Sequence, residues 1–354
     1  MQQAEMSCVL SLQGALEPLD EHLQCVSDFS NPHTLLVLLC PAVFWLHMRR
    51  RDELGGLSLL MVTNFADWLN VVLKFPLAGN RPYWVDSRVR QFPHTCESGY
   101  GMPSGHCMVS VAALFYLIFA YGSTYQRLLS PLGLVITAAI CISRIHTGSH
   151  FPSQVVAGTA LGFYLAIVAS KKCRLRGWMS KLDLQSPRRI MLIAFCGGFA
   201  CFILILAELS ILRAFDVDPL SSLNKAREGC HSLEAVKRTT SPMKSVARNA
   251  GICIGSGFGI ALRKMQTKRG SSSAFRNLGR LSYLQILEIV VGILMMKLAD
   301  TFLLQNEKHA GDYDVPYSFS HFTVLFLFAT WMIPSIMEAT IGSHWCVSKV
   351  AKYC

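Results

Sequence analysis

Charged residues are scarce in this sequence. They make up 16% of its 354 residues, while 52% are hydrophobic, and a typical soluble domain has about 25% charged residues. This composition excludes an ordinary soluble globular protein. The hydrophobic residues fall into blocks that approach the ~20 residues a helix needs to cross a bilayer. Since backbone polar groups in lipid must be satisfied within the helix itself, we expect an all-α, polytopic membrane protein.

Several familiar motifs are also absent. The 13 cysteines show no CxxC pair and no Cys/His spacing typical of a metal site, so no metal centre is expected. Runs of Lys and Arg are short, and the formal net charge of +11 therefore indicates contact with acidic lipid and not with nucleic acid. Residues 1–33 are acidic and lack a basic start followed by an apolar core, so we expect no cleavable signal peptide.

Nine stretches are candidate membrane spans. They lie near residues 34–48, 55–77, 107–123, 129–146, 151–170, 190–212, 246–262, 281–303 and 318–341. The first and the seventh of these are short, and the seventh is also Gly-rich, so that it could instead be a re-entrant or interfacial segment.

The distribution of charge predicts the orientation. When the loops are sorted alternately from the N-terminus, one set holds 19 Lys and Arg residues and the other set holds 11. The positive-inside rule places the richer set in the cytosol. The C-terminus then lies in the cytosol and the N-terminus on the opposite side. Cys96 and Cys230 share that opposite side and could form a disulfide, although free thiols are the favoured interpretation.

Three polar motifs meet at that same non-cytosolic face. They are KFPLAGNRP (Lys74–Pro82), PSGH (Pro103–His106) and SRIHTGSH (Ser143–His150). Each motif lies at the end of a predicted span or in the loop between two spans. Alone, each is weak evidence, because a turn, a helix start or a snorkelling arginine would explain it. Their common location makes a shared site the better interpretation.

The residue types of these motifs suit the binding of phosphate. Lys74, Arg81 and Arg144 supply three positive charges, and two of them are planar guanidinium groups that match phosphate oxygens. Ser104 adds a hydroxyl group. Gly105 opens a predicted helix, and the N-terminus of a helix favours anions.

Two histidines complete the set, since phosphoryl transfer needs a nucleophile and a proton donor on opposite sides of phosphorus. The combination K-x6-RP, PSGH and SR-x5-H resembles the signature of the type-2 phosphatidic acid phosphatase and vanadium haloperoxidase superfamily. The resemblance implies that His150 attacks phosphorus and forms a phosphohistidine, while His106 is the general acid and then the base. It also implies that no metal or organic cofactor is needed, and that the phosphate ligands are Lys74, Arg81, Ser104, Gly105 and Arg144.

Longer segments resemble the glucose-6-phosphatase catalytic subunit family. They include NRPYW, QFPHTCESG, ADWLNVVLK, DVDPLSSLNKAREGC and TTSPMKSVARNAGICIGSGFGIAL. The resemblance runs from about residue 34 to the eighth span and is not apparent in the first 30 and last 50 residues. It implies a phosphatidic-acid-phosphatase-type helical core with nine spans, a lumenal N-terminus and a cytosolic C-terminus.

This resemblance implies hydrolysis of glucose 6-phosphate at the lumenal face of the endoplasmic reticulum membrane, in the context of gluconeogenesis. The expected parts are a lumenal segment at 1–33, a transmembrane phosphatase domain at 34–342 with its catalytic core at about 60–170, and a cytosolic tail at 343–354. Because the substrate is made in the cytosol, functional coupling to a glucose-6-phosphate transporter is also expected.

Some positions depart from these patterns. The wider superfamily has Asp four residues after the nucleophile, where this chain has Gln154. Asp67, on the helix face that also carries the first motif's lysine, is a candidate to orient His150, and a polar contact between helices is the alternative. Ser153 and Met102 replace residues common in the family and leave the substrate and rate open, but not the phosphoryl chemistry.

Two further polar residues have open roles. Glu97 could hydrogen-bond sugar hydroxyls, or it could pair with Arg88 or Arg90. His146 could reach the pocket, although a solvated loop histidine is the favoured interpretation.

Three other functions are alternatives to hydrolysis of the sugar phosphate. A lipid phosphate phosphatase of the same superfamily usually has six spans and keeps the Asp after the nucleophile. A weakly active regulatory paralogue is a second rival, although every motif residue is present. A transporter would show an inverted repeat, and the sequence shows no repeat.

Overall fold

The computed structural model describes residues 2–49, 53–93, 95–121, 126–170, 174–215, 218, 221–237, 241–268, 283–307 and 314–337. These residues are mainly helical. The described part contains no β-strand, only an isolated parallel bridge between Glu97 and Lys237. The expectation of an all-α protein is therefore confirmed, while the predicted tail at 343–354 lies outside the described residues.

The chain divides into two compact units. Unit 1 comprises Met1–Leu36, Met61–Leu175 and Cys201–Val246, and unit 2 comprises Val37–Leu60, Arg176–Ala200 and Ala247–Cys354. Long helices continue in sequence from one unit into the other, among them α5 (Glu53–Leu77), α11 (Pro187–Ala214) and α13 (Pro242–Lys268). All three predicted motifs belong to unit 1.

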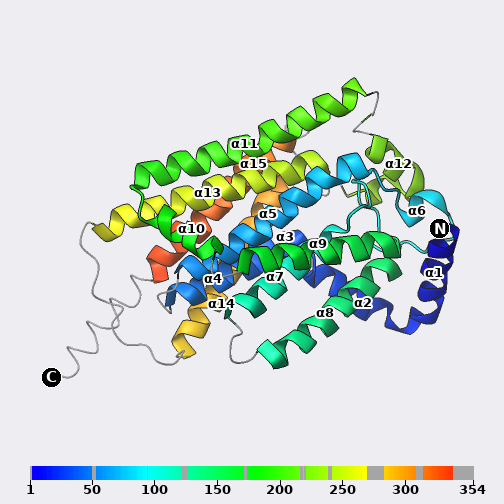
Figure 1. The fold of residues 1–354 in the computed structure, drawn as a ribbon, viewed down its shortest axis with the longest axis horizontal. Helices are drawn as coiled ribbons and strands as arrows, with labels where there is room; N and C mark the ends of the chain where they lie inside the picture. Colours follow the sequence, from blue (N-terminus) through cyan, green and yellow to red (C-terminus); the bar gives the residue numbers. More distant parts are fainter. Residues whose placement is uncertain are drawn as a thin grey trace. The chain divides into compact units, whose positions relative to one another are not determined.

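Unit 1 is built around α7 (Gly105–Tyr121), α8 (Gln126–His146) and α9 (Pro152–Ser170), of which α7 and α9 share the most extensive contact (Figure 1). Two glycines of α9 permit this approach. A Cβ on Gly158 would come within 2.5 Å of the carbonyl oxygen of Ser104, and one on Gly162 within 2.4 Å of that of Met108. Small residues let membrane helices pack closely, and here they bring the start of α7 against α9.

The N-terminal residues form helices that pack on this core. Both α1 (Gln2–Ala15) and α2 (Asp20–Phe29) contact α8, and α1 also contacts α9 (Figure 1). The buried side chain of Gln13 donates hydrogen bonds to the carbonyls of Arg90 and His146, at 3.0 and 2.8 Å. The carboxylate of Glu5 accepts a hydrogen bond from the backbone N–H of Ser153 at 2.8 Å. The N-terminal segment is therefore a packed part of unit 1.

Unit 2 contains α4 (Cys40–Arg49), α14 (Tyr283–Glu307) and α15 (Asp314–Leu327). Trp45 is fully buried and donates a hydrogen bond from Nε1 to the carbonyl of Ala329 at 2.8 Å. A Cβ on Gly292 would meet the ring of Trp45 at 2.8 Å, so α14 and α4 also pack closely. His321 and Asp300 form a buried pair, with Nε2 3.0 Å from Oδ1.

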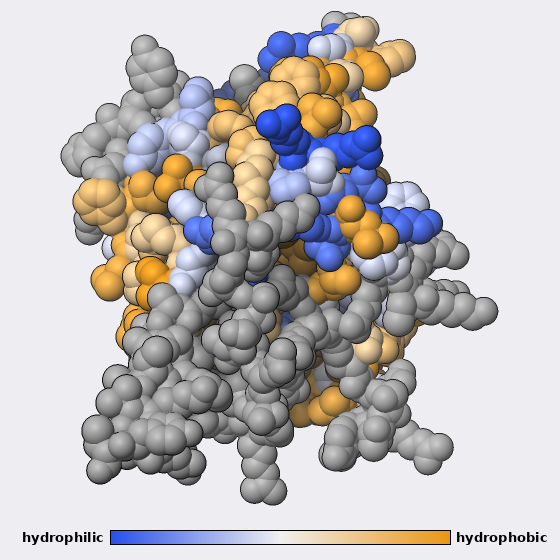
Figure 2. All heavy atoms as spheres, turned by 90° about the vertical axis from the view of Figure 1, so that its left-hand side faces the viewer, coloured by the Kyte–Doolittle hydropathy of each residue, from blue (hydrophilic) through white to orange (hydrophobic). Residues whose placement is uncertain are grey.

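The surface mixes polar and apolar areas. Figure 2 shows hydrophilic side chains (blue) gathered beside hydrophobic ones (orange) on one face. Along α11, several large hydrophobic side chains are exposed, among them Phe195, Phe199 and Leu204. Exposed apolar side chains on a long helix are typical of a surface that faces lipid.

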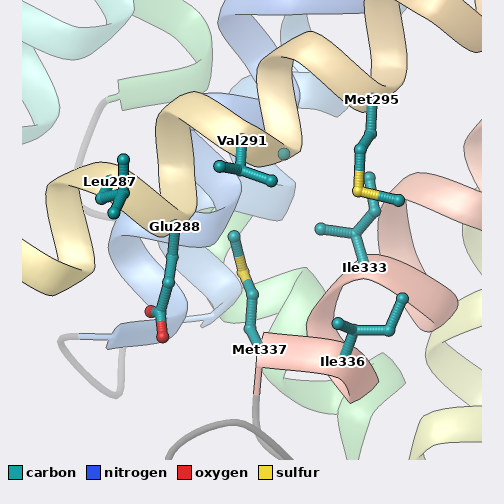
Figure 3. Close-up of a pocket in the computed structure, with 8 residues that line it drawn as sticks. Leu287, Glu288, Val291, Met295, Ile333, Ile336 and Met337 are labelled. Atoms are coloured by element: carbon teal, nitrogen blue, oxygen red, sulfur yellow. The ribbon is translucent and has the colours of Figure 1, made fainter.

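A cavity of about 180 Å³ lies in unit 2, between α14 and residues 333–337 (Figure 3). Its lining consists of aliphatic side chains, methionines and a glycine, apart from the carboxyl group of Glu288. The lining contains no Lys, Arg or His, so this cavity does not offer a site for a phosphate.

Five described helical segments are long and apolar enough to cross a bilayer, and a bent pair at Glu17–Phe29 and Pro32–Met48 would add a sixth. The five are Leu54–Val85, Leu129–His146, Pro152–Ser170, Pro187–Ala214 and Val315–Met337. Helix α7 is apolar but shorter. A helix lies at each of the nine predicted stretches, but α13 and α14 carry several charged residues and are not among the five. The multi-pass architecture is confirmed, and the number nine stays a prediction.

Candidate active site

The first motif begins on α5. Lys74 lies in the last turn of this helix, and its Nζ donates a hydrogen bond to the carbonyl of Tyr100 at 2.6 Å. The chain then turns at Ala78, whose φ of 41° is rare for a residue with a side chain. Arg81 follows in extended conformation, immediately before the short helix α6 (Pro82–Val85). The turn thus brings the lysine and the arginine of this motif to the same loop.

The guanidinium group of Arg81 is completely buried and extensively hydrogen-bonded. Its Nε donates to the carbonyl of Gly99 at 2.6 Å, and one terminal nitrogen donates to the carbonyl of Ser149 at 2.9 Å. The other terminal nitrogen donates to the carboxylate of Glu97 at 2.9 Å and to the carbonyl of Tyr100 at 3.1 Å. Arg81 therefore joins the first motif to the third.

The second motif forms the start of α7. Ser104 directly precedes Gly105, the first residue of the helix, and His106 follows. Asn70 of α5 fixes this turn, because its side chain donates to the carbonyl of Pro103 at 3.1 Å. A Cβ on Gly105 would come within 2.9 Å of Oδ1 of Asn70. The first N–H groups of a helix have no partner within it. The start of α7 can therefore offer N–H donors to an anion.

His150 lies in the turn before α9 and is completely buried. Its Nδ1 is 2.9 Å from the carbonyl of Gly101 and 3.3 Å from Oε1 of Gln154. Because these oxygens only accept, Nδ1 carries the hydrogen and Nε2 carries the lone pair. Nε2 lies 3.5 Å from a terminal nitrogen of Arg81. Burial, together with the charges of Arg81 and Arg144, holds the pKa of His150 well below its usual value.

Glu97 lies at the centre of the three motifs. Its Oε2 accepts a hydrogen bond from Arg81 at 2.9 Å, and its Oε1 accepts one from Arg144. Nδ1 of His106 is 3.8 Å from the same Oε1. Burial alone would raise the pKa of Glu97, but the neighbouring positive charges of Arg81 and Arg144 outweigh burial and hold it well below its usual value. The carboxylate is therefore ionised in the folded protein.

The sequence leaves the role of Glu97 open and does not predict its place between Arg81 and Arg144. Its predicted partners pair elsewhere: Arg88 is 2.6 Å from the carboxylate of Asp86, and Arg90 is 3.2 Å from that of Asp20. Pairing of Glu97 with Arg88 or Arg90 is therefore wrong. Glu97 lies in QFPHTCESG, a segment that resembles the family, but nothing in its spacing predicts contact with the two arginines of the motifs.

Two buried polar atoms of the site have no hydrogen-bond partner among the described residues. They are Oγ of Ser104 and Nε of Arg144, both on completely buried side chains. Buried polar groups without a partner are rare, because leaving one unsatisfied costs about 1–3 kcal/mol. The three cations of the motifs also exceed the single negative charge of Glu97. A bound anion would satisfy both atoms and the excess charge.

In the described part, no three His, Cys, Asp or Glu side chains could hold a metal ion.

The group that orients His150 differs from the one proposed from the sequence. The carbonyl of Gly101 lies at Nδ1 of His150, with Gln154 beside it. Asp67 is buried on α5, close enough to Lys74 to act on its charge. The structure thus assigns the orienting contact to a backbone carbonyl instead of Asp67. A carbonyl contact of this kind leaves no trace in a sequence.

Helix α2 supports the third motif. Arg144, in the last turn of α8, donates a hydrogen bond to the buried hydroxyl of Ser27 on α2. His146 is completely buried, and its Nε2 is 2.8 Å from Oδ1 of Asp20 on the same helix. The interpretation of His146 as a solvated loop histidine is therefore wrong. It binds α8 to α2, and no feature of the sequence predicts that the N-terminal helices cover this turn.

Cys96 and Cys230 form a disulfide, so the favoured interpretation of free thiols is wrong. The backbone N–H of Lys237 donates to the carbonyl of Cys96 at 2.8 Å, and the hydroxyl of Ser98 donates to the carbonyl of Lys237 at 2.9 Å. These bonds hold the segment that carries Glu97 from both sides.

Residues 55–178, which contain all three motifs, match the PAP2 superfamily. Glucose-6-phosphatase catalytic subunit 1 of Haplochromis nubilus is 31% identical to the chain over 363 residues, which cover 95% of this chain and 92% of the relative. The chain belongs to the glucose-6-phosphatase family. Within this family, glucose-6-phosphatase 3 of Mus musculus is 31% identical, with 71% of this chain and 73% of the relative covered. Glucose-6-phosphatase 2 of Mus musculus is 29% identical, with 75% and 79% covered.

Family membership extends further along the chain than the motifs suggested. Coverage of 95% includes most of the first 30 and last 50 residues, so the expectation that the resemblance stops there is wrong. No solved structure matches the chain.

Proposed function

We propose that this chain is a membrane phosphatase that hydrolyses glucose 6-phosphate to glucose and phosphate. The observation that carries the proposal is the buried cluster of cations with two unpartnered polar atoms, Oγ of Ser104 and Nε of Arg144. A phosphate dianion brings the negative charge and the acceptor oxygens that this cluster lacks. Its proposed ligands are Lys74, Arg81, Ser104, Gly105 and Arg144.

His150 is the proposed nucleophile. The lone pair on Nε2 forms a bond to phosphorus while the bond from phosphorus to the sugar oxygen breaks, which gives a phosphohistidine. His106 donates its proton to the departing oxygen, so glucose leaves as an alcohol. His106 then takes a proton from a water molecule whose oxygen attacks phosphorus, and the N–P bond breaks to release phosphate. The hydrogen bond from Nδ1 of His150 to Gly101 supports this role, because it leaves Nε2 free.

The rim of the site supports a polar leaving group. Asn80, which precedes Arg81, is exposed and accepts a hydrogen bond from Nζ of Lys225 at 2.9 Å. The same Nζ lies 6.0 Å from the ring centre of Trp84 and 5.9 Å from that of Tyr100. Amide, ammonium and aromatic groups at the rim suit the hydroxyl groups of a sugar.

A cavity favours a second candidate, the hydrolysis of a lipid phosphate. It has a volume of about 370 Å³, is lined mainly by apolar side chains and lies in unit 1. Its lining includes Phe75 and Ser98, the sequence neighbours of Lys74 and Glu97. An acyl chain would fit such a lining. Membership of the glucose-6-phosphatase family favours the sugar phosphate.

We place the site on the lumenal side of the endoplasmic reticulum membrane, with the N-terminus in the lumen and the C-terminus in the cytosol. The excess of Lys and Arg in the opposite loops supports this orientation. The disulfide between Cys96 and Cys230, beside the site, also suits an oxidising lumen. Since glucose 6-phosphate forms in the cytosol, the enzyme would depend on a separate transporter for it.

Phosphate release by membranes that contain the full chain tests the proposal. Glucose 6-phosphate and phosphatidate are assayed in parallel, in intact and in detergent-opened vesicles. His150→Ala is the catalytic variant, and His22→Ala, at an exposed position on α2, is the matched control.

We expect release from glucose 6-phosphate that rises on opening the vesicles, persists in His22→Ala and disappears in His150→Ala. Release from phosphatidate alone would contradict the sugar substrate and establish the lipid phosphatase. If phosphate were released from neither substrate, the proposed hydrolysis would be contradicted, and the regulatory paralogue would be the remaining interpretation.

A further inference from the structure

Glu97 holds an ionised carboxylate inside a site proposed to bind a phosphate dianion. It is 6% exposed, and both of its oxygens face positive or protonatable groups. Oε2 binds Arg81, while Oε1 lies between Arg144 and Nδ1 of His106. A buried charge persists only when it is paired. Arg81 and Arg144 supply that pairing.

The backbone around Glu97 is fixed on two sides. The neighbouring Cys96 is bound to Cys230, and the carbonyl of Glu97 accepts a hydrogen bond from the hydroxyl of Tyr83 at 2.7 Å. The following residue, Ser98, is hydrogen-bonded to the carbonyl of Lys237. The carboxylate is therefore a fixed element of the site and not a side chain that swings in from solvent.

We propose that Glu97 is a positioning residue of the reaction, which holds Arg81 and Arg144 in place and orients His106 as the proton donor when phosphate binds. This inference rests on the proposed phosphatase function. Nδ1 of His106 faces Oε1 of Glu97, so Nε2, on the far side of the ring, is the nitrogen left for the substrate. A carboxylate at Nδ1 fixes the ring orientation and stabilises the imidazolium form.

Substrate binding couples the two roles of Glu97. Phosphate oxygens compete with the carboxylate for the N–H groups of Arg81 and Arg144. Nδ1 of His106 is then the remaining partner of Oε1. The Nε2–H bond of His106 breaks and the proton joins the leaving oxygen, which keeps the electron pair of the broken P–O bond. His106 remains neutral with its hydrogen on Nδ1 toward Glu97, ready to take a proton from water. No other reactant is required.

Esters with different leaving groups test this role, because a poor leaving group needs the proton and a good one does not. We choose phenyl phosphate and p-nitrophenyl phosphate and measure kcat/KM for the full chain in opened membranes. Glu97→Gln removes the charge and keeps the shape, and His106→Ala is the reference for loss of the acid. The matched control is Glu21→Gln, at an exposed position on α2.

Loss of general-acid catalysis typically costs 10²–10⁴-fold in rate. We expect kcat/KM of Glu97→Gln to fall about 100-fold or more on phenyl phosphate and roughly tenfold or less on p-nitrophenyl phosphate. His106→Ala should show the same difference between the two esters. Glu21→Gln should match the wild type. Equal losses on both esters in Glu97→Gln would overturn the proposal and leave Glu97 a purely structural counter-ion.

A second variant covers the case in which Glu97→Gln does not fold. Glu97→Asp keeps the charge but moves it away from His106, so kcat/KM should again fall more on phenyl phosphate than on p-nitrophenyl phosphate, by a smaller factor. Equal losses on the two esters would overturn the proposal. Because both esters lack a sugar, a wild-type chain that cleaves them but not glucose 6-phosphate refutes the proposed substrate alone. A wild-type chain that cleaves neither ester nor glucose 6-phosphate overturns both proposals.

Discussion

The guanidinium group of Arg144 on α8 donates a hydrogen bond to the hydroxyl of Ser27 on α2. Both side chains are almost completely buried. Asp20, also on α2, pairs with His146, which lies two residues after Arg144 on α8. The N-terminal helices therefore support the end of α8 and, through it, Arg144, one of the proposed phosphate ligands.

Ser27→Ala should impair catalysis without abolishing it. The substitution removes a hydrogen bond to a charged group, which contributes about 1.5–3 kcal/mol, so we expect kcat/KM to fall roughly tenfold. The matched control is Ser30→Ala, which removes a neighbouring buried hydroxyl that donates only to the carbonyl of Ser27. Steady-state kinetics with one phosphate ester checks both variants. Equal losses in the two would show that α2 acts only through general stability.

Ser104→Ala should separate binding from stability. Its hydroxyl has no partner among the described residues, so its removal should leave the melting temperature unchanged while kcat/KM falls roughly 10- to 100-fold, the loss expected for one hydrogen bond to a phosphate oxygen. Ser110→Ala on the same helix is the control, since its hydroxyl donates to the carbonyl of Ser30 at 3.0 Å. That variant should show the reverse pattern. A loss of stability in Ser104→Ala with normal kinetics would contradict the phosphate contact.

Cys230→Ser should lower both stability and activity. The disulfide closes a loop across a sequence separation of 134 residues, and removing a native disulfide typically costs about 2–5 kcal/mol. Activity falls because the segment that carries Glu97 is released. Thermal unfolding and phosphate release, with and without dithiothreitol, check this. Cys8→Ser, at an exposed free cysteine, should match the wild type, and an effect of dithiothreitol on Cys230→Ser equal to that on the wild type would contradict the assignment.

The stability of the protein should depend on pH through Glu97. Its pKa is held well below the usual value in the folded protein, whereas it is about 4.3 in an unfolded chain. The unfolded chain therefore binds the proton first as the pH falls. The stabilisation by ionised Glu97 is complete above about pH 5 and is lost progressively toward the folded pKa.

Thermal unfolding of the wild type and of Glu97→Gln between pH 7 and pH 3 measures this contribution. The difference in melting temperature should be constant from pH 7 to pH 5 and should shrink below it. Glu21→Gln serves as the control. A difference that grows as the pH falls would show that the carboxyl group is protonated, not ionised, in the folded protein.

Much of the site could be predicted because its residues form three short motifs. Lys74, Arg81 and Arg144 each lie near the end of a helix, so the hydropathy pattern alone brings them to one membrane face. His106 and His150 share that face for the same reason. The structure places Arg81 3.5 Å from His150 and joins the two through the backbone of Ser149. The helical class could be predicted equally well, because a bilayer permits few alternatives.

The contacts that hold those residues could not be predicted. Glu97 meets both arginines through a loop whose path depends on its disulfide and on Lys237. Gly101 orients His150 through a backbone carbonyl, which any residue carries. Ser27 reaches Arg144 from 117 residues away in the sequence. In each case the decisive interaction joins distant parts of the chain and uses a group that is common at any surface.

The measurement that tests this account most directly is the trapping of a phosphoenzyme. Opened membranes are mixed with an ester labelled with ³²P, quenched in alkali, and the chain is isolated and digested. We predict an alkali-stable, acid-labile label on the peptide that contains His150, present in the wild type and in His22→Ala and absent in His150→Ala. Equal labelling of His150→Ala, or turnover by that variant at the wild-type rate, would contradict nucleophilic attack by His150.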